Sequence, residues 1–315
     1  MKRKSIITSV ASYSLTKEEE SLLSNKKPWG IILFKRNIKN MSQLKELTSR
    51  IRFLMKDPCY PIMVDQEGGR VSRLSRIIDT RDFPQNLFGQ LFEKNKLLGI
   101  NSYNEYLYFT CQILKETGIN INTVPVLDIL KSNTHKVIGD RSYSRNLNTI
   151  NILKKICFAA LDKFKIGSVS KHIPGHGCSN VDTHKKLAVV HSSLNSLLKK
   201  DFKTFKNINS NFSMTAHIIY KKIDPLNTAT HSKVLIKNII RKKLGFRGIL
   251  ISDDISMKAL SGNLVYNAKK AIQSGCNLVL YCKGNIKESS VLLSKIDDID
   301  NFTKKKTSEF YRFLR

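Results

Sequence analysis

The sequence lacks any apolar run long enough to cross a membrane. A membrane-spanning helix needs roughly 20 consecutive, mostly apolar residues, whereas the hydrophobic residues here, 41% of the chain, fall in short runs. The first residues faintly resemble a secretory leader, because Lys2, Arg3 and Lys4 precede an apolar run over residues 6–10. Thr8 and Ser9 interrupt that run, and acidic residues follow at 18–20. We therefore interpret it as a first strand and expect no membrane association.

Paired cysteines are also absent. The six cysteines are scattered without a Cys-x-x-Cys pair, at positions Cys59, Cys111, Cys157, Cys178, Cys276 and Cys282. In a chain of this size, such spacing is typical of reduced and mostly buried thiols rather than of a disulfide framework. We therefore expect a cytoplasmic protein.

Acidic residues are scarce beside basic ones. The chain has 25 Asp and Glu against 54 Lys and Arg, which gives a formal net charge of +29. A nucleic-acid-binding protein gathers such charge into a basic patch or arm that neutralises phosphates. Here the lysines are spread along the chain, and the abundance of Lys, Asn and Ile is typical of an AT-biased genome. We expect no specific nucleic-acid partner.

The chain has eight short apolar, β-branched runs, separated mostly by segments with helical periodicity. The runs lie at residues 6–10, 30–34, 61–64, 121–126, 167–170, 212–215, 248–251 and 277–281. Strands that alternate with helices eight times predict a parallel sheet closed into a (β/α)8 barrel of the TIM type. An open, doubly wound sheet is the alternative. No linker or repeat divides the chain, so we predict one catalytic domain over residues 1–315.

Polar side chains follow five of the predicted strands. The segments are Asp65-Gln-Glu-Gly-Gly-Arg-Val-Ser-Arg73, Asp128 with Ile138-Gly-Asp-Arg-Ser142, Lys171-His-Ile-Pro-Gly-His-Gly177 with Asp182-Thr-His184, Met214-Thr-Ala-His217 and Ser252-Asp-Asp254. In such barrels the chemistry lies at the carboxyl ends of the strands. P-loop, Gly-x-Gly-x-x-Gly, Gly-x-Ser-x-Gly and His-Glu-x-x-His motifs are missing, which disfavours nucleotide, serine-nucleophile and helix-borne metal chemistry. A sugar-type site is favoured, and a metal site from His172, His176, Asp182, His184 and His217 stays open as an alternative.

These segments resemble the β-N-acetylglucosaminidase branch of glycoside hydrolase family 3, in the family's order from residue 30 to residue 257. Further matches are Gly30-Ile-Ile-Leu-Phe-Lys-Arg-Asn37, Pro125-Val-Leu-Asp128 and Leu244-Gly-Phe-Arg-Gly248 leading to Ile251-Ser-Asp-Asp-Ile-Ser-Met257. The Lys-His-x-Pro-Gly-His-Gly and Asp-x-His segments are the most diagnostic. Two positions depart from the family pattern: Cys178-Ser179 replaces Asp-Thr, and Thr228-Ala-Thr230 replaces Pro-Ala-Thr.

The resemblance implies a retaining glycosidase mechanism. Asp253 matches the nucleophile that forms a covalent glycosyl-enzyme, and Asp254 is the competing candidate. His184 matches the acid/base of this branch. Asp182 matches its partner, because a carboxylate orients an imidazole and stabilises its protonated form. Without the surrounding motif, the last two would be interpreted as solvated loop residues.

The resemblance also implies a sugar-binding set, namely Asp65, Arg73, Arg141, Lys171 and His172. The carboxylate would accept bonds from sugar hydroxyls, and the cations and the imidazole would donate. Arg73 has a competing interpretation as an exposed charge on a helix. Glu67 is expected to support the Gly68-Gly69 turn, and His176 and His217 are expected to be structural or to support the residues that contact the sugar.

The implied reaction is hydrolysis of a terminal β-linked N-acetylglucosamine from muropeptide-type amino sugars, with a 1,6-anhydro-N-acetylmuramic acid leaving group. No cofactor and no resident metal are implied, and we expect a monomer. Two alternatives stay open. One is transfer of the sugar to phosphate, and the other is a barrel that binds sugar or nucleic acid without turnover.

Overall fold

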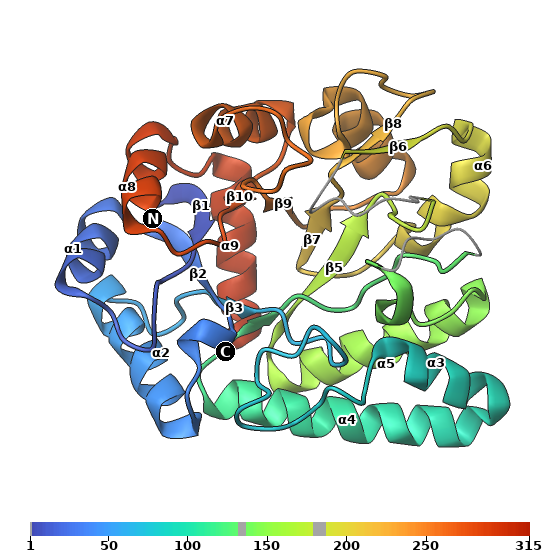
Figure 1. The fold of residues 1–315 in the computed structure, drawn as a ribbon, viewed down its shortest axis with the longest axis horizontal. Helices are drawn as coiled ribbons and strands as arrows, with labels where there is room; N and C mark the ends of the chain where they lie inside the picture. Colours follow the sequence, from blue (N-terminus) through green and yellow to red (C-terminus); the bar gives the residue numbers. More distant parts are fainter. Residues whose placement is uncertain (1, 132–136, 179–186) are drawn as a thin grey trace.

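Eight parallel strands close into a barrel. The computed structural model describes residues 2–131, 137–178 and 187–315. The strands are β1 (Lys4–Thr8), β2 (Pro28–Leu33), β3 (Ile62–Val64), β4 (Ile121–Asn122), β5 (Gly167–Ile173), β7 (Phe212–Thr215), β9 (Ile249–Asp254) and β10 (Leu278–Leu280). Their order around the barrel is β1-β10-β9-β7-β5-β4-β3-β2 (Figure 1). This closure confirms the predicted (β/α)8 barrel and excludes the open sheet.

Helices surround the barrel (Figure 1). They are α1 (Lys17–Lys26), α2 (Met41–Met55), α3 (Gln85–Lys94), α4 (Lys96–Glu116), α5 (Leu147–Phe164), α6 (Leu194–Lys199), α7 (Leu264–Ser274), α8 (Ile286–Lys295) and α9 (Asn301–Leu314). Short 3₁₀ turns lie at η1 (Lys35–Asn37), η2 (Gly139–Arg141), η3 (Asp201–Phe205) and η4 (Ala229–His231), and η5 (Leu235–Lys243) is a π-helix.

Helix α2 shows how the sequence sets these boundaries. The Asn40 side chain accepts a hydrogen bond from the Gln43 amide, which caps the amino end. Leu44, Leu47 and Ile51 are buried. Their spacing of three and four residues places them on one side of the helix, toward the strands.

Helix α9 closes the barrel interior. The interior is lined by apolar side chains that include Trp29, Phe212 and Phe310. Phe310 of α9 packs edge-to-face on Phe212, with ring centroids 5.0 Å apart. The Trp29 indole donates to Thr307 Oγ1 at 2.9 Å. From the sequence alone, the basic run at residues 304–306 predicts a solvated helix end. That prediction was wrong, because the apolar residues of α9 are needed to cover the end of the barrel where the strands begin.

A two-stranded parallel sheet, β6 (Ala188–Val190) with β8 (Ile218–Tyr220), lies outside the barrel and was not predicted. Figure 1 shows it beyond the carboxyl end of β5. Strand β8 begins three residues after β7 ends. Only Ala216 and His217 separate β7 from β8, and no helix lies between them, so the alternation of strand and helix did not reveal β8.

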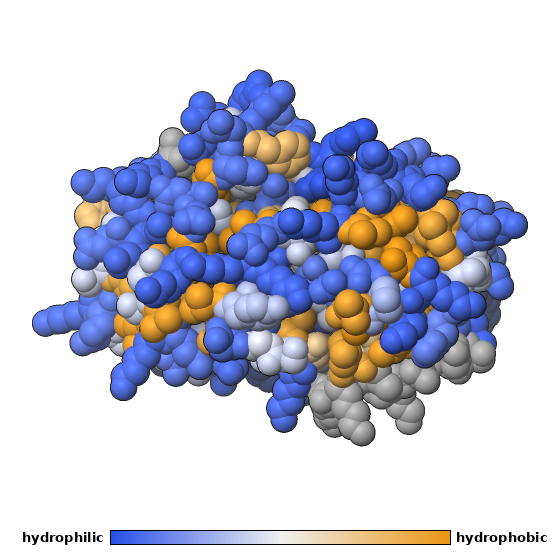
Figure 2. Space-filling view, turned by 90° about the horizontal axis from the view of Figure 1, so that it is seen from above, coloured by the Kyte–Doolittle hydropathy of each residue, from blue (hydrophilic) through white to orange (hydrophobic). Residues whose placement is uncertain are grey.

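The view in Figure 2 shows a surface that is mainly hydrophilic, with separate apolar groups between the polar side chains. No helix in the described ranges is both long and apolar enough to span a membrane. Few of the charged residues in the described ranges are buried; they include Arg3, Glu19, Glu67, Asp128, Lys171 and Asp201.

We predict that Phe310→Ala lowers the free energy of unfolding by about 3–5 kcal/mol, the usual cost of removing a buried aromatic ring. The ring is 2% exposed and contacts Phe212 inside the barrel. The matched control is Phe302→Ala on the same helix, where the ring is 41% exposed, and we expect a loss below about 1 kcal/mol. Urea unfolding measures both, and equal losses would contradict the closing role of α9.

Candidate active site

Lys171 joins two carboxylates at the carboxyl end of the barrel. Its side chain, from β5, lies 2.5 Å from Glu67 Oε1 and 3.3 Å from Asp65 Oδ1, both of which follow β3. The ammonium also donates to Thr123 Oγ1 at 2.7 Å, and Thr123 in turn donates to Asp65. The Glu67 amide donates to the Val71 carbonyl across the Gly68-Gly69 turn at 3.0 Å, as expected, but its side chain has the further role of a central ion-pair partner of this site.

Arg141 extends this network to His172. Its guanidinium binds Glu67 through two nitrogens, Nε to Oε2 at 2.8 Å and Nη2 to Oε1 at 2.9 Å. Such paired geometry fixes a guanidinium in its plane. Arg141 Nη2 also lies 3.5 Å from His172 Nε2. Three of the predicted sugar-binding residues, from η2 and β5, are thus held side by side.

Asp128 holds the segment that contains His172. Its Oδ2 lies 2.7 Å from His172 Nδ1, and its Oδ1 accepts from the backbone amide of His176 at 2.7 Å. Because a carboxylate accepts only, Nδ1 carries the proton, and Nε2 faces Arg141. Sequence reasoning assigned no role to Asp128, although its place after β4, within the Pro-Val-Leu-Asp match, was a usable signal.

The cations keep the two central carboxylates ionised. Burial raises the pKa of Glu67, but Arg141 and Lys171 outweigh that effect and lower it to about 2. Burial likewise opposes ionisation of Asp65, whose pKa is nonetheless held well below its usual range by Lys171 and Arg73. At neutral pH, both side chains are therefore acceptors only, suited to hydroxyl donors.

Arg73 belongs to the site and not to a helix. It lies in the irregular segment after β3, with Nη2 3.4 Å from Asp65 Oδ2. Its guanidinium also lies 5.4 Å from the centre of the Phe34 ring, within the range of a cation–π contact. The competing interpretation as an exposed helical charge was wrong.

Asp253 and Asp254 end strand β9 and have different surroundings. Asp254 accepts from the Ser256 amide at 3.0 Å, the Ser256 hydroxyl at 2.7 Å and the Cys282 amide at 3.3 Å. Asp253 Oδ1 accepts from the Asp254 amide at 2.7 Å. Ser256 and the Cys282 amide thus tie Asp254 to the segments that follow β9 and β10, which is a structural role.

Two buried groups connect Asp253 to the rest of the site. Burial lowers the pKa of His217, and the charge of Asp253 opposes this, with His172 also in range. Burial raises the pKa of the Cys282 thiol well above its ordinary value, and the carboxylates of Asp254, Asp65 and Asp253 add to the rise. Charged or titratable groups at the ends of β3, β5 and β9 therefore influence the pKa values of the same two buried neighbours.

Asp182 and His184 lie outside the described residues. Of the other candidate metal ligands, His172 bonds to Asp128, and His217 lies 2.7 Å from Thr230 Oγ1 and 3.1 Å from the Asp254 carbonyl. Within the described ranges, no group of three or more His, Cys, Asp or Glu side chains is arranged to hold a metal ion.

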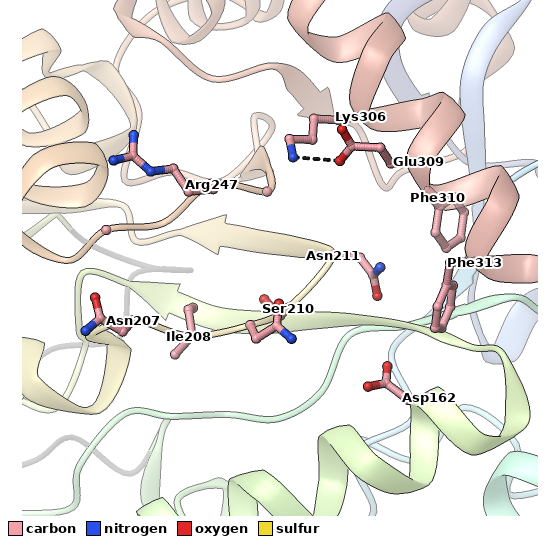
Figure 3. A pocket seen from close by; sticks show the side chains of 13 residues that line it. Asp162, Asn207, Ile208, Ser210, Asn211, Arg247, Lys306, Glu309, Phe310 and Phe313 are labelled. Atoms are coloured by element: carbon pink, nitrogen blue, oxygen red, sulfur yellow. Dashed lines mark hydrogen bonds and ion pairs between the residues drawn. The ribbon is translucent and has the colours of Figure 1, made fainter.

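A cavity of about 480 Å³ lies at the other end of the barrel (Figure 3). Residues 207–211 and Gly245, Arg247 and Gly248, which precede β7 and β9, line it together with α9. Its Lys306 and Glu309 form an ion pair at 2.6 Å. This end of such barrels serves stability rather than chemistry, so the site of reaction is the opposite rim.

Together the fold and this rim define a class of protein, a (β/α)8 barrel with a polar cluster of carboxylates, cations and histidines at the carboxyl ends of its strands. Residues 5–309 match the glycosyl hydrolase family 3 N terminal domain. A β-hexosaminidase of Nitrosomonas eutropha is 36% identical over 282 residues, covering 88% of this chain and 80% of that protein. One from Neisseria meningitidis is 33% identical over 283 residues, covering 88% and 77%.

The crystal structure of NagZ from Neisseria gonorrhoeae in complex with N-trifluoroacetyl-D-glucosamine is similar throughout. Its TM-score is 0.88 at 30% identity, covering 100% of this chain and 91% of that one. The chain belongs to glycosyl hydrolase family 3, in the group of the β-hexosaminidases, and is a glycosidase.

We predict that Glu67→Gln lowers the free energy of unfolding at pH 7 by about 3–5 kcal/mol, because Arg141 and Lys171 lose a buried partner. The folded pKa of Glu67, about 2, lies below its ordinary 4.5. Its ionisation therefore stabilises the fold above pH 4.5, and this contribution is lost as the pH falls through about 2. The difference in the free energy of unfolding between wild type and variant, measured by urea titration, should accordingly shrink below pH 4.5.

The control for this prediction is Glu309→Gln, which breaks the half-exposed pair with Lys306. Exposed pairs contribute little, so we expect no resolvable change. A difference in the free energy of unfolding between wild type and Glu67→Gln that stayed constant down to pH 3 would contradict the electrostatic explanation.

Proposed function

We propose that this glycosidase is a retaining exo-β-N-acetylglucosaminidase. Its substrate is a peptidoglycan fragment, N-acetylglucosamine β-linked to 1,6-anhydro-N-acetylmuramic acid, with or without peptide. We place it in cell-wall recycling in the cytoplasm, where it works without a cofactor. The observation that carries the proposal is the network of Asp65, Glu67, Lys171, Arg141 and His172 on the same rim as Asp253.

The sugar contacts follow from donor and acceptor chemistry. Ionised Asp65 accepts from sugar hydroxyls, while Lys171, Arg141 and Arg73 donate to hydroxyl or N-acetyl oxygens. The His172 imidazole presents Nε2 beside Arg141. Because each of these groups already has a partner that fixes it, the sugar meets oriented donors, and little further ordering is required.

The reaction is a double displacement. An oxygen of Asp253 attacks the anomeric carbon while His184 gives its proton to the departing glycosidic oxygen, and Asp182 holds the imidazole. His184 then takes a proton from water, whose oxygen attacks the same carbon and releases the Asp253 carboxylate. Two inversions leave the β configuration unchanged.

The test is hydrolysis of a chromogenic β-N-acetylglucosaminide, with the β-glucoside as control. We expect wild type to cleave the first and not the second, and Asp253→Ala to lose nearly all turnover. Asp254→Asn should keep more activity, because its side chain binds Ser256 and the backbone rather than the sugar. A fluorinated mechanism-based sugar that labelled Asp254 in place of Asp253 would contradict the assignment. Faster turnover in phosphate, with sugar phosphate as product, would identify a phosphorylase.

The assignment of the acid/base gives a further prediction. His184→Ala should lower turnover of natural disaccharides far more than that of nitrophenyl glycosides. A nitrophenolate departs without a proton, whereas a sugar alkoxide depends on general acid catalysis, typically worth roughly 10²–10⁴-fold. Asp182→Asn should show a smaller effect of the same kind. Azide should partly rescue His184→Ala and yield a β-glycosyl azide, and equal losses on both substrates would exclude the acid role.

A further inference from the structure

A buried carboxylate that the proposed mechanism does not use lies behind the turn that follows β5. Asp201, the first residue of η3, is fully buried. Its Oδ2 accepts from the Cys178 amide at 3.3 Å. Its Oδ1 has no hydrogen-bond partner within the described part of the chain. Burying an unmatched carboxylate oxygen is costly.

The turn is built around this carboxylate. A Cβ at Gly177 would lie 2.8 Å from Asp201 Oδ1, and one at Gly175 would lie 3.0 Å from its Cγ. Gly175 also has a φ of +147°, a conformation that side-chain-bearing residues rarely adopt. Both glycines are therefore required for the backbone to approach Asp201 so closely.

The same turn is held from its other side by Asp128. The His176 amide, between the two glycines, donates to Asp128 Oδ1 at 2.7 Å, and Asp128 Oδ2 contacts His172 Nδ1. Tyr220 donates its hydroxyl to the Gly175 carbonyl. A displacement of the turn would thus be passed through Asp128 to the ring of His172, which lies beside Arg141.

We propose that Asp201 is a positioning residue for the glycosidase: its carboxylate fixes the Gly175–Cys178 turn and, through Asp128, the orientation of His172. The inference rests on the proposed function, which gives His172 its role in sugar binding. The ionised carboxylate attracts the Cys178 amide, whereas a neutral side chain attracts it less. The turn is therefore set by the charge of Asp201 as well as by its shape.

The surroundings of Asp201 support a role for its charge. Burial raises its pKa to about 6; the Lys131 ammonium opposes this rise, and the Asp128 carboxylate adds to it. Lys131 also contacts Cys178 Sγ. Among the described residues, the Cys178 thiol and the Tyr220 phenol are further titratable neighbours, and burial and next the charge of Asp201 raise the pKa of each. A folded pKa above the ordinary 3.8 means that Asp201 stabilises the fold while protonated and that this contribution is lost as pH rises through about 6. Groups that cost stability in their working state are typical of functional sites.

The test is Asp201→Asn, an isosteric and neutral replacement. At pH 8 we expect kcat/KM for the chromogenic N-acetylglucosaminide to fall about tenfold or more, the scale of a small misplacement. The melting temperature at pH 8 should be equal to or higher than that of wild type, because a buried charge is removed. As the pH falls to 5, both differences should vanish, since both side chains are then neutral.

The matched control is Thr204→Val in the same η3 turn, which removes the hydroxyl that donates to the Asp201 carbonyl. It should lower the melting temperature and leave the pH dependence of kcat/KM unchanged. Lys131→Met is the second variant, and it requires no change at Asp201. Loss of the ammonium should raise the pKa of Asp201. In Lys131→Met, kcat/KM should therefore begin to fall at a higher pH than in the wild type as the solution is made more acidic.

Three outcomes overturn the inference. The first is that Asp201→Asn has the same kcat/KM as the wild type at every pH. The second is that Asp201→Asn loses kcat/KM by the same factor at every pH. The third is that Lys131→Met leaves the acid side of the pH profile of kcat/KM where it is in the wild type. Calorimetric binding of N-acetylglucosamine separates this inference from the proposed function. Suppose that the wild type binds the sugar without hydrolysing it, and that Asp201→Asn binds it more weakly than the wild type at pH 8 but equally at pH 5. That result refutes the proposed function and supports the positioning role of Asp201. Wild type with neither binding nor hydrolysis overturns both.

Discussion

The ion pairs of Lys171 are the interaction on which the site depends. One ammonium, 3% exposed, contacts two carboxylates that follow β3, two strands away in the barrel, and Arg141 also binds the second of them, Glu67. Two anions and two cations in a buried space are nearly neutral together, although each alone would be expensive to bury. Because every member is held by another, the groups are oriented before a substrate arrives, which is the condition for electrostatic catalysis.

The barrel supplies the rigidity that this arrangement requires. Strands β3, β4 and β5 are neighbours in one closed sheet, so Asp65, Thr123 and Lys171 lie at adjacent strand ends with fixed spacing. At the opposite end, α9 fills the barrel with Phe310 against Phe212. The two ends of the barrel therefore have different roles. Apolar packing stabilises the end where the strands begin, and the paired charges lie at the end where the strands finish.

The sequence was sufficient for the eight barrel strands, since each is a short apolar run between turn or helical segments. It did not predict β6 and β8, because they pair with each other outside the barrel and interrupt the alternation of strand and helix. It also did not predict the role of α9, because the basic residues of that segment suggest a solvated helix. At the site, residue types at strand ends indicated a polar rim, and the family resemblance singled out Asp65, Arg141, Lys171 and His172 within it. The partners Glu67, Asp128 and Asp201 were missed or misassigned, because ion pairing depends on distances between strands that no local pattern contains.

The charge of the whole chain and the charge of the site have opposite signs. The molecule has a net charge of +29, which on its own would oppose the positive charge that develops on a sugar ring in glycoside cleavage. Among the described residues of the rim, however, the five carboxylates Asp65, Glu67, Asp128, Asp253 and Asp254 outnumber the four cations Arg36, Arg73, Arg141 and Lys171. Surface cations are screened over roughly 8–10 Å in physiological salt, whereas buried groups are screened far less. The reacting sugar would therefore experience the local excess of negative charge, and the basic surface can vary with genome composition without altering the chemistry at the rim.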